Sequence, residues 1–113
     1  MHILIIGAAG MIGRKLTENL ARRGTLRDQQ ISRLTLADIV QPDAPETTFP
    51  VATIALDLTT PASAKRLIAT RPDVIFQLAA VVSGEAEADF DKGYAVNLDG
   101  TRHLLEAIRQ EGL

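Results

Sequence analysis

Three glycines in the spacing Gly-x-x-Gly-x-x-Gly constrain the fold of this chain more than any other feature: Gly7, Gly10 and Gly13. They follow an apolar run at residues 3–6 and lead into a helical pattern that begins at Met11. The first N–H groups of a helix have no partner inside the helix, and the peptide dipoles leave partial positive charge at that end. A strand that turns on glycines into a helix therefore predicts a diphosphate-binding site.

Each glycine has an expected role in such a site. Gly7 would permit the tight turn, Gly10 would let the backbone approach the phosphates, and Gly13 would let the helix pack closely on the strand. The expected cofactor-binding residues are Gly7, Gly10, Met11, Ile12 and Gly13. A glycine-rich turn that only shapes the chain is the alternative. The phosphate loop of nucleoside triphosphatases is set aside, because no Lys-Ser or Lys-Thr pair follows the glycines.

Length, charge and cysteine content narrow the class of protein. A chain of 113 residues is one domain or part of one. Its net charge of −2 predicts neither a nucleic-acid nor a membrane partner. The chain has no cysteine, and its opening apolar run is too short for a signal sequence or a membrane span, so we expect a cytoplasmic protein. The acidic residues within 85–91 alternate, which would spread them around a helix, so no metal site is expected.

Residues 2–32 read as a strand, a helix and a connection. Residues 2–6 are predicted to form a strand buried on both faces of a parallel sheet, because the apolar run at 3–6 is continuous and does not alternate. A helical pattern over residues 11–23 follows, with Gly24 just past its end. Residues 25–32 are polar and without a pattern, which indicates a connection. The buried face of the helix is expected to carry Ile12, Leu16 and Leu20.

A second strand, over residues 34–38, ends on Asp38. In dinucleotide-binding folds an acid at this strand end accepts hydrogen bonds from the adenosine ribose hydroxyls, and its charge repels a 2′-phosphate. Asp38 therefore predicts NAD over NADP as the cofactor. It lies farther from the glycines than the roughly 20 residues usual for this motif, so the segment 25–32 is expected to be an insertion. An aspartate that only begins a turn is the alternative.

Two further apolar runs complete the expected sheet. Residues 51–56 precede the pair Asp57-Leu58, and residues 74–80 hold the fourth strand and the start of its loop. Between them, Thr60 predicts the N-cap of a helix. A long helix follows, and its buried face is expected to carry Tyr94, Leu98, Thr101, Leu105 and Ile108. Together these units predict a doubly wound α/β fold with a parallel sheet in the order 3-2-1-4.

The motifs, in their order along the chain, resemble the extended branch of the short-chain dehydrogenase/reductase superfamily, which includes nucleotide-sugar epimerases, dehydratases and dehydrogenases. That resemblance implies a Rossmann-type fold that binds NAD. One departure is Gln77, where the family usually has histidine. The matching motifs are the glycine triplet, Ala37-Asp38, Asp57-Leu58, Leu78-Ala79-Ala80 and Asn97-x-x-Gly100-Thr101.

The resemblance also implies roles for single residues. Asp57 and Leu58 would contact the adenine, with the Asp57 carboxylate reaching its exocyclic amine. An Asp57 that only caps the next helix is equally open. Small side chains just past the end of a strand let a flat cofactor lie against the backbone, which is the role expected of Ala79 and Ala80.

Within the superfamily, three stretches are similar to the D-erythronate dehydrogenases: residues 71–76, 82–87 and 89–94. This resemblance implies NAD-dependent oxidation of a hydroxyl of a small sugar acid. Ser83 is a candidate for substrate contact or for a helix cap, and Asn97 would bond the strand-end loops or the cofactor. A homodimer is also implied. The alternatives are a nucleotide-sugar epimerase or dehydratase with tightly bound NAD, and a nucleotide-binding module without catalysis.

An enzyme of this kind needs a Tyr-x-x-x-Lys pair, in which the lysine lowers the pKa of the tyrosine so that it can take the substrate proton. Tyr94 is not such a tyrosine, because Leu98 stands where the lysine is required. No residue of this chain is therefore assigned a catalytic role. We expect residues 1–113 to be the N-terminal part of an NAD-binding Rossmann domain, with the rest of the sheet and the substrate domain lying elsewhere in a longer protein.

Overall fold

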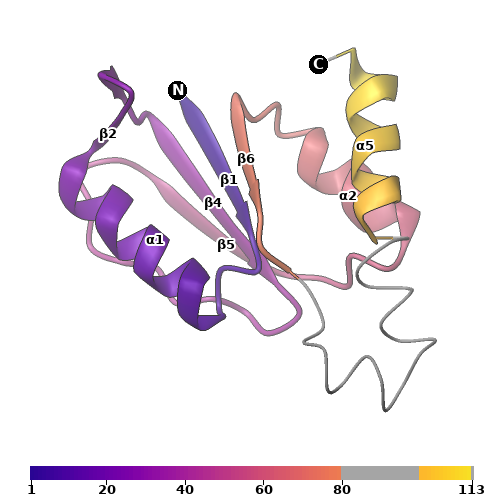
Figure 1. The fold of residues 1–113 in the computed structure, drawn as a ribbon, viewed down its shortest axis with the longest axis horizontal. Coiled ribbons are helices and arrows are strands. Elements are labelled where there is room, and N and C mark those ends of the chain that lie inside the picture. Colours follow the sequence, from indigo (N-terminus) through magenta and orange to yellow (C-terminus); the bar gives the residue numbers. More distant parts are fainter. Residues whose placement is uncertain (80–99, 113) are drawn as a thin grey trace. The chain divides into compact units, whose positions relative to one another are not determined.

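The computed structural model describes residues 1–79 and 100–112 and contains a four-stranded parallel sheet (Figure 1). The strands lie in the order β5-β4-β1-β6. When only these four strands are numbered along the chain, the order is 3-2-1-4, as predicted. They are β1 (His2–Ile6), β4 (Arg33–Asp38), β5 (Val51–Ala55) and β6 (Val74–Gln77). The other described elements are α1 (Met11–Arg23), β2 (Thr25–Leu26), β3 (Gln29–Gln30), α2 (Pro61–Ile68) and α5 (Gly100–Glu111).

The chain divides into two compact units. One unit runs over Met1–Leu56 and Pro72–Leu78, and it holds the sheet, α1 and the short strands β2 and β3. The other unit includes Asp57–Arg71 and α5. The glycine triplet and Asp38 belong to the first unit, whereas Asp57, Leu58 and Ala79 belong to the second.

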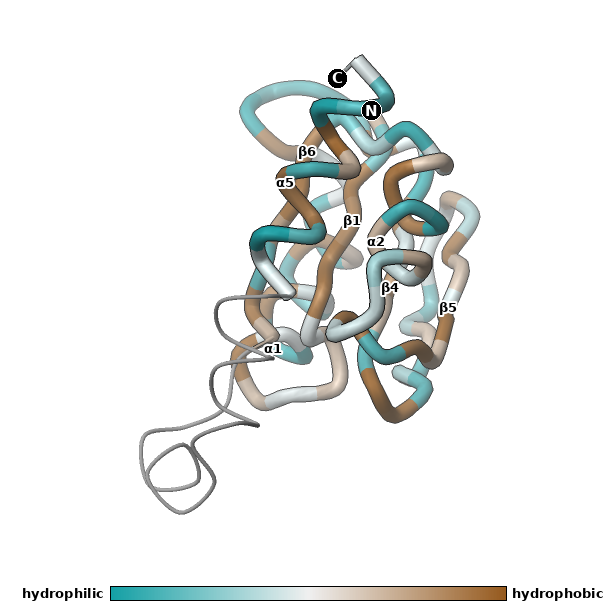
Figure 2. Tube along the Cα trace, turned by 90° about the vertical axis from the view of Figure 1, so that its right-hand side faces the viewer, coloured by the Kyte–Doolittle hydropathy of each residue, from teal (hydrophilic) through white to brown (hydrophobic). Residues whose placement is uncertain are grey.

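β1 is the strand on which the first unit is built. It pairs in parallel with β4 on one side and with β6 on the other, so Ile3 faces both Leu34 and Val74. All five of its residues are buried, which explains the continuous apolar run that Figure 2 shows along β1. Because the strands are parallel, their carboxyl ends lie at the same edge of the sheet. Ile6 ends β1 and Asp38 ends β4 at this edge.

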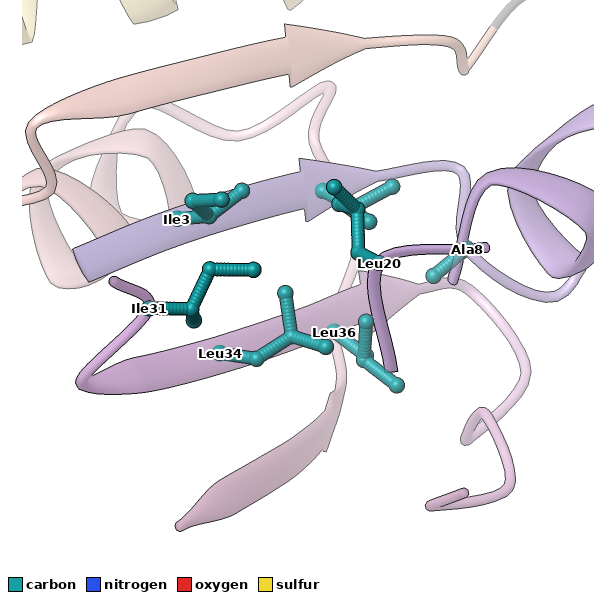
Figure 3. Close-up of a cluster of buried hydrophobic side chains, with 7 residues drawn as sticks. Ile3, Ala8, Leu20, Ile31, Leu34 and Leu36 are labelled. Atoms are coloured by element: carbon teal, nitrogen blue, oxygen red, sulfur yellow. The ribbon is translucent and has the colours of Figure 1, made fainter. Parts of the chain in front are cut away.

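The face of the sheet that α1 covers carries the core of the first unit. Side chains from β1, β4 and α1 converge there (Figure 3). Burying an isoleucine or leucine side chain contributes about 1.5–3 kcal/mol, so this cluster holds the helix on the sheet. Its members are Ile3, Ile5, Ala8, Leu20, Ile31, Leu34 and Leu36.

The helix α1 has the predicted bounds, but its buried stripe differs from the predicted one. Gly13, Thr17 and Leu20 are buried, while Ile12 is 67% exposed. The contact between Gly13 and the preceding loop fixes the rotation of the helix. Successive side chains of a helix point about 100° apart, so Ile12 cannot face the same side as Gly13. Ile12 therefore points away from the sheet. The helix ends as expected, with Gly24 at φ 69° and its N–H donating to the Leu20 carbonyl at 2.8 Å.

The segment predicted as a connection contains a short hairpin. β2 and β3 pair antiparallel, with Thr25 opposite Gln30. The two residues of the turn, Arg27 and Asp28, have φ values of 50° and 65°, as the tight turn of a two-residue hairpin requires. The sequence hid this hairpin because neither turn residue is glycine or asparagine, and because two-residue strands are too short for a pattern.

In the second unit, α2 and α5 pack against each other. Ala64, Leu67 and Ile68 of α2 are buried. The prediction for α5 was wrong in its rotation: Leu104 is buried, whereas Leu105 is 61% exposed. Leu104 and Leu105 are adjacent, so periodicity alone could not decide which of them faces α2.

Gly13 offers a test of how tightly α1 is seated. A Cβ at Gly13 would overlap the carbonyl oxygen of Gly7 and lie 2.7 Å from the Cα of Ala8. We expect Gly13→Ala to lower the free energy of unfolding by roughly 1–3 kcal/mol or more, as overpacking does, in urea denaturation. Gly10→Ala is the control, because its Cβ would find its nearest atom at an ordinary 3.5 Å. Equal midpoints for the two variants would contradict this account of the packing.

Candidate functional site

The glycine loop leaves β1 at the edge where the carboxyl ends of the strands meet. Gly7 has a φ of 91°, a conformation that a side chain would strain, so the tight turn expected there is present. The N–H groups of Gly7 and Ala8 both donate to the carbonyl of Ala37, at 2.8 and 3.2 Å. Gly10 in turn donates to the Gly7 carbonyl at 3.2 Å. The loop is thus fixed to β4 by its own backbone.

The first turn of α1 presents backbone donors that nothing in the described part of the chain accepts. Arg14 is the first residue of the helix whose N–H has a partner, the Gly10 carbonyl at 2.9 Å. The N–H groups of Met11, Ile12 and Gly13 have none among residues 1–79 and 100–112. Gly10 has no side chain to cap them, and the first turn carries no acidic residue. An anion would therefore find three free donors and the positive end of the helix dipole.

Asp38 lies at the end of β4, and two backbone amides hold its carboxylate. Its Oδ2 accepts the N–H of Ala9 at 2.9 Å, and its Oδ1 accepts the N–H of Ile39 at 2.7 Å. Each carboxylate oxygen can accept more than one hydrogen bond, so both can still accept from a ligand. The bond to Ala9 brings the acid directly beside the glycine loop.

A cavity of about 460 Å³ adjoins these groups. Its walls come from the glycine loop, the first half of α1 and the loop after β4, all within the first unit. Sequence reasoning missed it, because a proline-containing loop gave no sign of folding back toward α1. The lining residues are Ala8, Ala9, Arg14, Thr17, Glu18, Val40, Gln41, Pro42, Asp43, Ala44 and Pro45.

Asp57, in the second unit, organises the turn that leads into α2. Its Oδ1 accepts the N–H of Thr59 at 2.9 Å and the hydroxyl of Thr59 at 2.7 Å. The Thr59 hydroxyl bond, and after it the Thr59 amide bond, hold the pKa of the Asp57 carboxyl below its ordinary value. Asp57 thus bonds Thr59 in the turn before α2, whose N-cap is Thr60, and an adenine contact stays a prediction. Leu58 beside it is 8% exposed.

The remaining predicted site residues fall at or beyond the limit of the description. Ala79 follows β6 and is partly buried. Ala80, Ser83 and Asn97 lie outside the described residues. Across residues 1–79 and 100–112, no helix is long and apolar enough to cross a membrane, and no three metal-ligating side chains come together.

A family model with the description "NAD dependent epimerase/dehydratase family" matches residues 3–113. The chain belongs to this family. Membership confirms the cofactor, NAD, and the Rossmann-type fold that the motifs predicted.

Curated relatives and solved structures are also similar to this chain. The D-erythronate dehydrogenase of Cupriavidus necator is 47% identical, over 99% of this chain and 36% of that protein. The D-erythronate dehydrogenase of Haemophilus influenzae is 36% identical, over 97% of this chain and 34% of that protein. The chain thus spans about a third of the length of the curated relatives that it matches.

The crystal structure of a nucleoside-diphosphate-sugar epimerase from Agrobacterium tumefaciens matches with a TM-score of 0.94 and 56% identity, over 98% of this chain and 33% of that one. A uronate dehydrogenase variant from the same organism, solved in complex with NAD, matches with a TM-score of 0.75 and 27% identity, over 96% of this chain and 36% of that one.

The bonds of Asp57 lead to a prediction about its titration. Replacing Thr59 with valine removes the hydroxyl that lowers the pKa of Asp57 most, so this pKa should rise toward its ordinary value, as followed by NMR titration of the carboxyl carbon. A lowered pKa stabilises the fold above the ordinary carboxyl pKa, and the benefit is lost as the pH falls through the lowered value. The stability difference between wild type and Thr59→Val should therefore disappear in acid.

Thr59→Ser is the matched control, because it keeps the hydroxyl and should keep the low pKa. An identical titration of Asp57 in the valine and serine variants would mean that the hydroxyl has no such effect.

Proposed function

We propose that this chain is the N-terminal part of an NAD-binding Rossmann domain in a longer dehydrogenase, which oxidises a hydroxyl of a small sugar acid of the D-erythronate type. One observation carries the cofactor site: three free backbone amides at the start of α1 lie near the Asp38 carboxylate. The bond from the Ala9 N–H to Asp38 holds the glycine loop and this carboxylate together. The names of the curated relatives support the substrate class.

The free amides of Met11, Ile12 and Gly13 would hold the diphosphate. They are the donors that a helix cannot satisfy by itself, and they lie at the positive end of its dipole. Gly10 suits the same role, because a Cβ there would make only an ordinary contact of 3.5 Å, and no described part of the chain requires glycine at this position. Its lack of a side chain is best explained by the close approach of a ligand.

Asp38 would accept the hydroxyls of the adenosine ribose. Both of its oxygens are oriented by backbone amides and keep acceptor capacity. A phosphate on the 2′-oxygen would bring two negative charges against this carboxylate, which favours NAD over NADP.

The rest of the cofactor would be held by residues that the family pattern supplies. We assign Asp57 and Leu58 to the adenine, Ala79 and Ala80 to the backbone wall beside the cofactor, and Asn97 to the strand-end loops or the cofactor itself. Ser83 is assigned to the substrate. Residues outside this chain would supply the tyrosine that takes the hydroxyl proton and the lysine that lowers its pKa, as the hydride passes to NAD.

The activity is tested on the longer protein that carries this chain. Incubation with D-erythronate and NAD should produce NADH absorbance in proportion to the substrate consumed. Aldonates of other lengths should react more slowly, and NADP should replace NAD poorly. No NADH formation with any small aldonate would rule out the proposed reaction.

A nucleotide-sugar epimerase is the second candidate, and the 56% identity to a structure described as a nucleoside-diphosphate-sugar epimerase favours it. The two reactions differ in the fate of the hydride. A dehydrogenase releases NADH, whereas an epimerase returns the hydride to the substrate. Conversion of a nucleotide sugar without net NADH, by protein purified with NAD already bound, would support the second candidate over the first.

The ribose role of Asp38 makes a prediction about affinity. Asp38→Ala should weaken NAD binding roughly 10- to 100-fold in calorimetric titration, because a hydrogen bond to a charged group contributes about 1.5–3 kcal/mol. The preference for NAD over NADP should narrow as well. Asp28→Asn is the control: it removes one negative charge at the hairpin turn, where asparagine tolerates the positive φ. Unchanged discrimination in Asp38→Ala, with unfolding like that of wild type, would contradict the ribose role.

A further inference from the structure

The cavity between α1 and the loop after β4 lies close to Asp38. Ala9, which donates its N–H to Asp38, lies in its wall, and so do Val40 and Gln41, which follow Asp38 closely in the chain. These residues place the cavity close to Asp38, which is not itself one of the lining residues. With a volume of about 460 Å³, the cavity has ample room for a phosphate group.

Among residues 1–79 and 100–112, three charged side chains line this cavity: Arg14, Glu18 and Asp43. In the part of the chain that the structure describes, none of the three makes a hydrogen bond or an ion pair. None of them is therefore held in a close ion pair, and whatever enters the cavity meets two carboxylates and one guanidinium. Together with Asp38, the negative charges outnumber the positive one.

We propose that Glu18 and Asp43 form a second barrier against NADP, behind Asp38, because they line the cavity into which a 2′-phosphate would extend. This inference rests on the proposed function, in which Asp38 holds the ribose. A phosphate on the 2′-oxygen cannot stay against the Asp38 carboxylate, and the adjoining open space is this cavity. The phosphate would there meet Glu18 and Asp43 without enough positive charge to balance them.

The same geometry gives Arg14 the opposite role. It is the one basic residue that the described part of the chain contributes to the cavity wall, and a guanidinium can bind a phosphate through two parallel hydrogen bonds. With the acids in place, its charge is outweighed. Once they are neutralised, Arg14 becomes the ligand for the 2′-phosphate, so the preference between NAD and NADP depends on the balance between these three side chains.

The test measures the ratio of the dissociation constants for NADP and NAD by calorimetric titration, in a series built on Asp38→Asn to bring NADP binding into range. Adding Glu18→Gln and Asp43→Asn should lower the ratio about tenfold, or about threefold for each carboxylate, as for screened charges near a protein surface. Adding Arg14→Gln to that triple variant should raise the ratio again. Both changes should shrink at high salt, which a purely structural effect would not do.

The matched control on the same Asp38→Asn background is Glu46→Gln with Asp28→Asn. It removes the same two charges from exposed residues of the first unit that do not line the cavity, so its ratio should not change. Equal ratios in the two sets of variants, or no measurable NADP binding after the cavity acids are removed, would overturn the barrier while leaving the proposed function intact. Failure of the wild-type protein to bind NAD would overturn the proposed function, and the barrier with it.

Discussion

The close contact between Gly13 and the loop at Gly7 and Ala8 is the constraint on which the rest of the first unit depends. The loop can turn sharply because Gly7 takes a positive φ, and the helix can approach it because Gly13 carries no Cβ. Once α1 is seated there, its rotation is fixed, so Thr17 and Leu20 face the sheet and Ile12 does not. The free amides of the first turn are therefore placed at the sheet edge by packing.

The same edge gathers chemistry from distant parts of the sequence because the strands are parallel. The register of β4 against β1 brings Asp38 beside the glycine loop, where its carboxylate accepts the N–H of Ala9. The loop after β4 then folds back to line a cavity with α1. One compact unit thus combines the free backbone amides of the first turn of α1, a carboxylate held by two other backbone amides, and a cavity lined in part by charged side chains.

Local pattern was enough to predict the strands and the bounds of α1, because buried runs, cap residues and glycine turns are encoded by neighbours in the sequence. The sheet order was predicted from the doubly wound topology of dinucleotide-binding folds. It failed where a long-range contact decides. The rotation of α1 depends on the loop at Gly7, and the choice between Leu104 and Leu105 depends on α2. The hairpin at Arg27 and Asp28 uses turn residues that seldom adopt positive φ. The amides that hold Asp38, and the cavity beside it, arise from backbone geometry that no motif records.

The bond between Ala9 and Asp38 affects how a dinucleotide would fit the site. Because this bond joins the glycine loop to Asp38, the residue proposed to accept the ribose hydroxyls, the fold sets the spacing between the two before any ligand arrives. Such rigidity reduces the entropy lost on binding. It also fixes the distance between Asp38 and the glycine loop, so a ligand that contacts both must match that distance.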